Sequence, residues 1–155
     1  MFKLKAGLLL AACLLAGCVS AALRPFYYHP EFTKQDPLPL LEKMKEIEKQ
    51  DFDNIRLETI AENDLSSHHL VVIRKAEPLH YHATHDAWAL VLKGKGDFLL
   101  GEKGEKALAL RPGSSVYIPR GMRHKATRRG KTSLAAFVIF TPPYDGKDIV
   151  PVEEK

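Results

Sequence analysis

The feature that most constrains the fold is a succession of short runs rich in β-branched and aromatic residues, separated by turn residues, between positions 55 and 140. The predicted strands span residues 55–60, 69–74, 87–92, 97–100, 106–110, 115–118 and 132–140. Turns are indicated by Lys103-Gly104, Pro112-Gly113 and Arg129-Gly130. Because no helical pattern interrupts these runs, the sequence predicts an all-β sandwich or barrel, and 155 residues leave room for a single domain.

One short amphipathic helix is expected before the strands. Residues 38–50 carry Leu40, Leu41, Met44 and Ile47 at helical spacing, with charged residues on the other side, so this helix should pack outside the barrel. The proline-containing segment 18–37 is interpreted as a tether that ends by packing against the domain. The barrel is assigned to residues 51–145 and a C-terminal tail to residues 146–155.

The first 17 residues are interpreted as a signal peptide. Lys3 and Lys5 precede an apolar run over residues 6–16, which is too short to cross the roughly 30 Å hydrocarbon core of a bilayer as a permanent helix. The run ends in Leu15-Ala16-Gly17-Cys18, which resembles a bacterial lipobox and implies cleavage before Cys18 followed by its acylation. The alternatives are an uncleaved buried helix and an ordinary signal peptide that happens to contain cysteine.

Lipidation at Cys18 would hold the domain on the cell envelope outside the cytoplasm, through its acyl chains alone. Val19, rather than Asp, follows the cysteine, which favours the outer over the inner membrane in a Gram-negative cell. The formal net charge is +4, and Lys3 and Lys5 contribute two of these charges, so the excess is too small to support nucleic-acid binding. Both cysteines, Cys13 and Cys18, precede the domain, which therefore holds no disulfide.

Three histidines are the candidate metal ligands. His80 and His82 are two residues apart, so an extended chain places both imidazoles on one face. His124 follows a strand that ends at Pro119 and turns at Gly121. Three neutral imidazoles suit zinc, iron, nickel or copper, and they leave coordination positions open for water or substrate. The alternative is that these histidines are ordinary core or surface residues of a barrel without a metal.

The same residues resemble the two motifs of the cupin family, G-x5-H-x-H-x(3 or 4)-E-x6-G and G-x5-P-x-G-x2-H-x3-N. The residues that match are His80, His82, Gly94, Gly113, Pro119, Gly121 and His124. The similarity covers about residues 55 to 140. It implies a single jelly-roll β-barrel that holds a divalent metal ion, such as iron, manganese, zinc or nickel, and pairs of such barrels often form homodimers through an exposed edge strand.

Two departures from the motifs matter for the metal centre. Counting back from Gly94, the metal-binding glutamate of the family falls on Ala87, and the final asparagine is Arg128. The centre is therefore either a three-histidine site or a three-histidine site completed by Asp86, if the loop shifts by one residue. His85 could also reach the ion, but a loop histidine beside such a site is more often a neighbour of the ligands than a ligand.

The strand at residues 87–92 alternates small and bulky residues. If Ala87 points inward, as its motif position implies, Ala89 and Val91 leave the cavity near the metal roomy and apolar, and Trp88 packs as a core residue outside it. His68 and His69 have no motif around them and are predicted to face solvent.

Six basic residues crowd around the third histidine, and no acidic residue occurs from Lys106 to Tyr144. Three interpretations remain open. The residues form a solvated basic edge, or Arg120 or Arg123 at the barrel mouth grips a carboxylate or phosphate of a substrate, or the patch faces anionic lipid headgroups.

The expected function is that of a lipid-anchored metal-binding cupin outside the cytoplasm, acting as an oxygenase or isomerase on a small organic molecule, which is anionic if the arginines bind it. The alternative is a non-catalytic module that binds a sugar, another small molecule or the metal. A third, weaker interpretation is a structural envelope protein. The sequence contains no nucleophile with its base and no phosphate-binding loop, which disfavours hydrolase and nucleotide-dependent chemistry.

Overall fold

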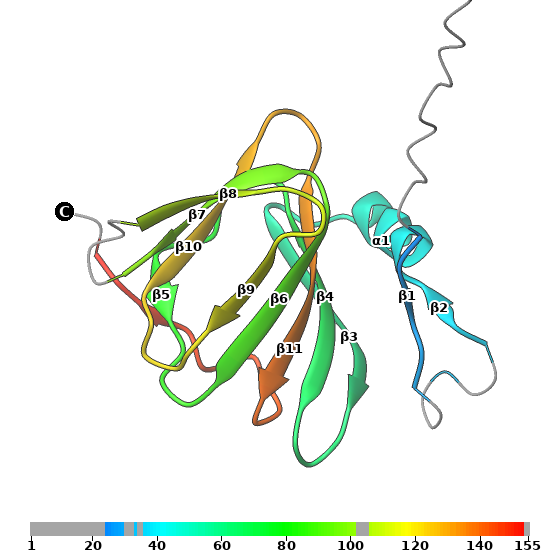
Figure 1. The fold of residues 1–155 in the computed structure, drawn as a ribbon, viewed down its shortest axis with the longest axis horizontal. Helices are drawn as coiled ribbons and strands as arrows, with labels where there is room; N and C mark the ends of the chain where they lie inside the picture. Colours follow the sequence, from blue (N-terminus) through cyan, green and yellow to red (C-terminus); the bar gives the residue numbers. More distant parts are fainter. Residues whose placement is uncertain (1–23, 30–32, 34–35, 102–105, 154–155) are drawn as a thin grey trace, which may run out of the picture.

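Two five-stranded antiparallel sheets form the body of the protein (Figure 1). The structure is a computed structural model that describes residues 24–29, 33, 36–101 and 106–153. The predicted signal peptide, with Cys13 and Cys18, lies outside these residues. Across the part of the chain that is described, no helix combines the length and the apolar character that a membrane crossing requires.

One sheet, here called the apolar sheet, is built from strands β3, β4, β11, β6 and β9 in spatial order. Their bounds are β3 (Ile55–Glu62), β4 (Ser67–Ile73), β11 (Leu134–Thr141), β6 (Asp86–Lys93) and β9 (Ser115–Ile118). The other, here called the histidine sheet, has the order β12, β5, β10, β7 and β8. Its strands are β12 (Val150–Pro151), β5 (His80–Tyr81), β10 (His124–Arg129), β7 (Lys95–Leu100) and β8 (Lys106–Leu110).

The apolar sheet buries both of its faces along β4. Val71 and Ile73 point into the interior between the sheets, whereas Leu70 and Val72 point outward and are equally buried. Helix α1 (Leu40–Lys49) covers this outer face, as Figure 1 shows. Its residues Met44 and Ile47 pack there and are completely inaccessible to solvent. The prediction of an all-β barrel with one short helix outside it is confirmed.

The described part of the predicted tether also packs against the domain. Strand β1 (Phe26–Tyr27) pairs with β2 (Leu38–Pro39) beside the helix. The Tyr27 hydroxyl lies 2.6 Å from Nδ1 of His68, which joins the segment to β4.

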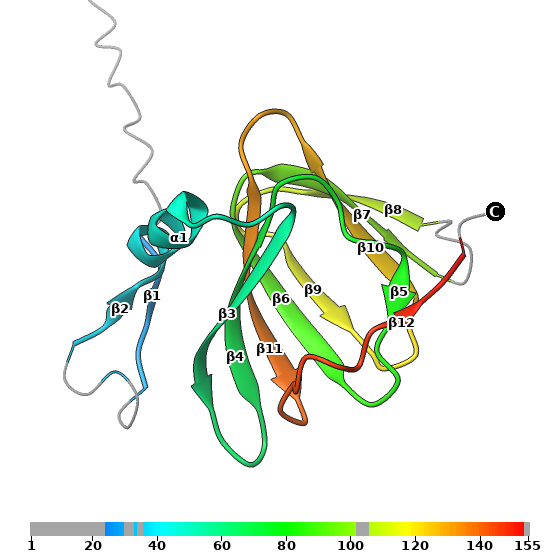
Figure 2. The same cartoon turned by 180° about the vertical axis from the view of Figure 1, so that it is seen from behind.

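At the other end of the domain, β12 pairs with β5, and Figure 2 shows the two strands side by side. The barrel therefore continues beyond residue 145, where the sequence placed the start of a tail. Strand β10 was also absent from the predicted strands, although it carries His124.

Two predicted side-chain environments are wrong. Trp88 is 37% exposed, because it lies on the outer face of β6 and the helix covers β4 and β11 instead. His69 does not face solvent and is only 1% exposed. It lies on the inward side of β4 with Val71 and Ile73, and its ring packs against the rings of Phe140 and Tyr144.

Candidate metal centre

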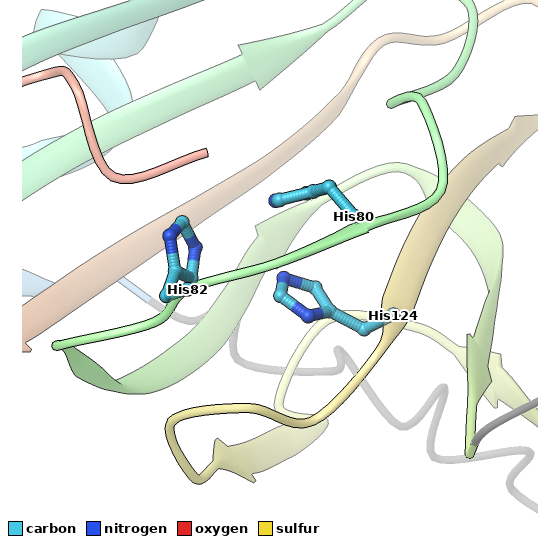
Figure 3. A group of neighbouring side chains, drawn as sticks. All are labelled: His80, His82 and His124. Carbon is cyan, nitrogen blue, oxygen red and sulfur yellow. The ribbon is translucent and has the colours of Figure 1, made fainter. Parts of the chain in front are cut away.

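The structure brings His80, His82 and His124 together inside the barrel (Figure 3). His80 begins β5 and is paired across the sheet with His124, the first residue of β10. His82 is the first residue after β5. Its ring centroid lies 5.1 Å from that of His80 and 5.3 Å from that of His124. One ring nitrogen of each histidine lies within 4.8 Å of the other two.

A backbone carbonyl orients each of the three rings. Nδ1 of His80 lies 2.8 Å from the oxygen of Pro78, and Nδ1 of His124 lies 2.8 Å from the oxygen of Met122. Nδ1 of His82 lies 2.5 Å from the oxygen of Asp148. Because a carbonyl oxygen can only accept, each Nδ1 must donate its proton, and each neutral ring keeps a lone pair on Nε2 for an ion.

Burial keeps the rings of His82 and His124 in the neutral form that binds metal. All three residues are at most 5% exposed. Burial, with the neighbouring His80, lowers the pKa of His124 to about 3, and burial also lowers the pKa of His82. Three buried neutral imidazoles fit a divalent transition metal such as zinc, iron or nickel, and they leave coordination positions for a substrate.

Two motif glycines have backbone conformations or close contacts that other residues would not fit, and one of them, Gly121, contacts the segment that carries His82. Gly121 has a φ of 79°, in the left-handed region, and its N–H donates to the carbonyl of His82 over 2.6 Å. This turn ties the loop before β10 to the segment after β5. Gly94 also has a positive φ, of 81°, and a Cβ there would lie 2.2 Å from the carbonyl oxygen of Ser133, so only glycine fits.

Asp86 does not join the three histidines, so of the two alternatives left open by the sequence the structure has the three-histidine group without Asp86. Its carboxylate accepts hydrogen bonds from the backbone N–H of Arg120 at 2.8 Å and from the guanidinium of Arg120 at 2.8 and 3.2 Å. These bonds lower the pKa of Asp86 to about 2. The arginine occupies both oxygens, which leaves a centre of three histidines.

A cavity of about 330 Å³ lies against the three histidines. Ala87, Ala89 and Val91 of β6 line it, which confirms the roomy, apolar wall predicted at these positions. Neither Arg120 nor Arg123 is among its lining residues. That Arg120 or Arg123 grips a substrate at the barrel mouth stays a prediction: Arg120 pairs with Asp86, and Arg123 is exposed.

Sequence reasoning missed Asp148, which fastens the loop that carries His82. Its carboxylate accepts hydrogen bonds from the backbone N–H groups of Ala83, Thr84 and His85, at 2.8, 2.9 and 3.1 Å, and lies 2.6 Å from Nδ1 of His85. Burial alone would raise the pKa of Asp148, but these hydrogen bonds outweigh it and hold the pKa below its ordinary value. His85 thus contacts Asp148 rather than the three histidines.

Glu77 is a second functional candidate that the sequence did not reveal. It lines the cavity, and its Oε2 accepts a hydrogen bond from the backbone N–H of Ala126 at 3.0 Å. Burial raises the pKa of Glu77, although His80 and the Ala126 N–H act in the opposite direction. A single glutamate before the first histidine gives no signal in the sequence, because no motif position corresponds to it.

Comparisons with known proteins agree with this architecture. The Cupin domain family matches residues 69–140. An uncharacterized protein from Aquifex aeolicus is 45% identical over 87 residues, which cover 56% of this chain and 69% of that protein.

Among solved structures, KdgF from Halomonas sp. superposes with a TM-score of 0.54 and 24% identity, covering 62% of this chain and 86% of that one. A variant of PAC13 from Streptomyces, solved with uridine, has a TM-score of 0.55 and 14% identity, covering 67% of this chain and 82% of that one. At these identities the structural likeness shows the fold alone.

Proposed function

The chain belongs to the cupin family, and from that premise we propose that it binds a divalent transition metal through His80, His82 and His124 and presents a small organic molecule to it. One observation carries the proposal. Each of the three converging histidines donates a hydrogen bond from its Nδ1–H to a backbone carbonyl, which leaves the lone pair of Nε2 for an ion. That arrangement fixes both the tautomer and the ring orientation that metal binding requires.

The proposed activity is that of an oxygenase or an isomerase. A bound metal would supply a Lewis acid for a carbonyl or hydroxyl group, or a redox centre if it is iron. The protein's own part is to orient the three imidazoles, to hold those of His82 and His124 neutral, to enclose the substrate in the cavity beside them, and to limit access of water.

A non-catalytic binding module is the second candidate. It is favoured by the pairing of Asp86 with Arg120, which removes the first carboxylate that follows His82 from the centre. Glu77 is the one acidic residue among the described residues that line the cavity, and a backbone N–H already engages it. A binder would retain its ligand unchanged, whereas an enzyme would convert it.

We also propose that the domain is anchored by lipid at Cys18 on the periplasmic side of the cell envelope, in the outer rather than the inner membrane. The support is the lipobox-like Leu15-Ala16-Gly17-Cys18 and the absence of Asp at Val19. Labelling with radioactive palmitate should mark the full-length protein and should be lost in Cys18→Ser. Label that persists in this variant would contradict the anchor. Association into homodimers through an exposed edge strand stays a prediction.

Elemental analysis of the untagged domain tests the metal centre. We expect about one transition-metal ion per chain in the purified protein, and its loss in His82→Ala. Iron would favour the oxygenase, whereas zinc or manganese would favour the isomerase or the binder. A protein that neither contains such a metal nor binds one when it is added would overturn the proposal.

A further inference from the structure

We infer that the ligand of this cavity is an apolar molecule with a single oxygen-bearing end, and not a sugar, a nucleotide or a polyanion. The inference rests on the proposed metal centre for the polar end of the ligand only. The rest follows from what the cavity walls are made of, which holds with or without a metal.

The apolar sheet forms the wall that faces the histidines. Each residue that β3, β4, β11, β6 and β9 contribute to the cavity has an apolar side chain, from Ile55 on β3 to Ile118 on β9. The histidine sheet adds Phe98, Leu110 and Ala126 beside His80 and His124. A ligand that fills the cavity therefore meets hydrocarbon over most of its surface.

Polar groups in the lining are few, and the three histidines account for most of them. Among the described residues that line the cavity, the others are Glu77 and Tyr144. No lysine, arginine, serine, threonine, asparagine or glutamine belongs to that lining. Each buried hydroxyl without a partner costs about 1–3 kcal/mol, so a sugar with several hydroxyl groups would bind poorly here. A phosphate or a second carboxylate would meet Glu77 and no cationic side chain.

The cavity extends well away from the histidines. The ring of Phe140 on β11 lies 5.2 Å from that of His82, whereas Ala136, which also lines the cavity, stands four residues earlier on the same strand. At about 3.3 Å per residue, this places Ala136 roughly 13 Å from Phe140. Small side chains at Ala87, Ala89 and Ala136 leave this space open, and 330 Å³ is within the range of small-molecule sites.

Hydroxamates that share one chelating head can test the inference. Acetohydroxamate, benzohydroxamate and gluconohydroxamate place the same two oxygens on a metal but carry a methyl, a phenyl and a polyhydroxyl tail. In calorimetric titrations of the Zn²⁺-loaded protein, we expect benzohydroxamate to bind at least about 10-fold more tightly than acetohydroxamate, because the ring is buried. Gluconohydroxamate should bind no more tightly than acetohydroxamate. Equal affinities for the methyl and phenyl compounds, or preference for the polyhydroxyl tail, would overturn the inference.

Variants that fill the middle of the cavity, at Ala89, or its far end, at Ala136, sharpen the test. Ala136→Leu and, independently, Ala89→Leu should reduce the preference for benzohydroxamate to within about 3-fold and leave acetohydroxamate binding and zinc content unchanged. Ala107→Leu, the same change at an exposed position of β8, is the matched control and should preserve the full preference. A full preference in both filling variants would show that the tail binds elsewhere.

Toluene separates a failure of this inference from a failure of the metal centre. Added to the metal-free protein, it should raise the Tm, and this rise should be lost in Ala136→Leu but kept in Ala107→Leu. If the protein binds no zinc and no hydroxamate but still binds toluene, the metal proposal fails and the apolar cavity stands. If toluene has no effect on the metal-free protein, the inference about the ligand is wrong.

Discussion

His69 and His124 are buried to nearly the same extent, at 1% and 3% exposed, but their hydrogen bonds differ. Both ring nitrogens of His69 have protein partners, with Thr59 Oγ1 at 3.1 Å from Nδ1 and Ser67 Oγ at 2.7 Å from Nε2. His124 has a protein partner at Nδ1 alone. Burial therefore does not distinguish a ligand from a structural histidine, whereas the number of ring nitrogens with a partner does.

The same distinction applies to the other described histidines that lie near the barrel. His68 places Nδ1 near the Tyr27 hydroxyl and Nε2 near the Ser66 hydroxyl, and His85 contacts Asp148 and the carbonyl of Pro143. In contrast, Nδ1 of His80, His82 and His124 contacts a carbonyl, and the described residues offer no hydrogen-bond partner to their Nε2 atoms, which a metal ion would bind.

The largest effect should be on metal content. His124→Ala should lower bound metal from about one ion per chain to less than about one tenth, because two imidazoles hold an ion poorly. His69→Ala, which removes an equally buried ring, should retain the metal. Mass spectrometry of the desalted proteins measures both. Loss of metal in the two variants alike would mean that the comparison between these histidines does not identify ligands.

Acid should destabilise the protein through the histidine that has two partners. Burial, with neighbouring His68, lowers the pKa of His69 from its ordinary 6.5 to about 4, so the unfolded chain takes up the proton first as the pH falls. The stability that neutral His69 contributes is present above pH 6.5 and is lost between pH 6.5 and about 4. The loss should amount to at most about 3 kcal/mol of the free energy of unfolding.

Urea unfolding of the metal-free protein at several pH values measures this dependence. His69→Leu should show a shallower fall between pH 6.5 and 4 than the wild type. If the free energy of unfolding falls equally with pH in both proteins, the acid sensitivity comes from other groups.

Replacement by leucine should separate the two kinds of histidine at constant pH. In the metal-free protein at pH 7.5, His69→Leu should cost about 1–3 kcal/mol of stability, because Thr59 Oγ1 loses its contact with the ring and the buried Ser67 hydroxyl keeps only the N–H of Tyr144. His124→Leu should change stability by less than about 1 kcal/mol, since only the Met122 carbonyl loses a donor while an unpaired nitrogen is removed. Chemical denaturation curves give both values, and a larger cost at His124 would contradict the comparison.

The smallest effect is expected at Asp148, which acts through His82. Asp148→Ala should weaken metal binding about 10-fold by freeing the loop at residues 83–85, although its backbone carbonyl remains. Competition with a chromophoric chelator measures the affinity. Asp145→Ala, at an exposed position nearby, is the control and should leave it unchanged. Equal affinities for Asp148→Ala and the wild type would show that the carboxylate does not position His82.

The sequence was informative where a periodic pattern or a motif spacing carried the signal. Long strands such as β6 and β11 were found because apolar residues dominate them. Strand β10 was missed because four of its six residues are polar or charged besides His124, and only Ala126 joins the core. Strands β5 and β12 have two residues each, too few for any pattern.

For the candidate site, spacing brought the three histidines together but could not assign their surroundings. The competition between Arg120 and a metal for Asp86 depends on where two loops meet, which neither loop encodes by itself. The rings of His82 and Phe140 meet across the interior, and that contact too is a property of the assembled barrel. Glu77 and Asp148 reach the site from outside both motifs, so only the folded chain reveals them.

The bond from His82 to the carbonyl of Asp148 spans 66 positions along the chain. A nascent polypeptide that has already exposed all three histidines would still lack the acceptor that sets the tautomer of one of them. The coordination geometry thus matures only after chain closure between distant segments, and such non-local contacts form late and slowly. A metal ion that binds before this contact forms would meet an incomplete site. We therefore expect correct metal binding in the folded domain and not in its folding intermediates.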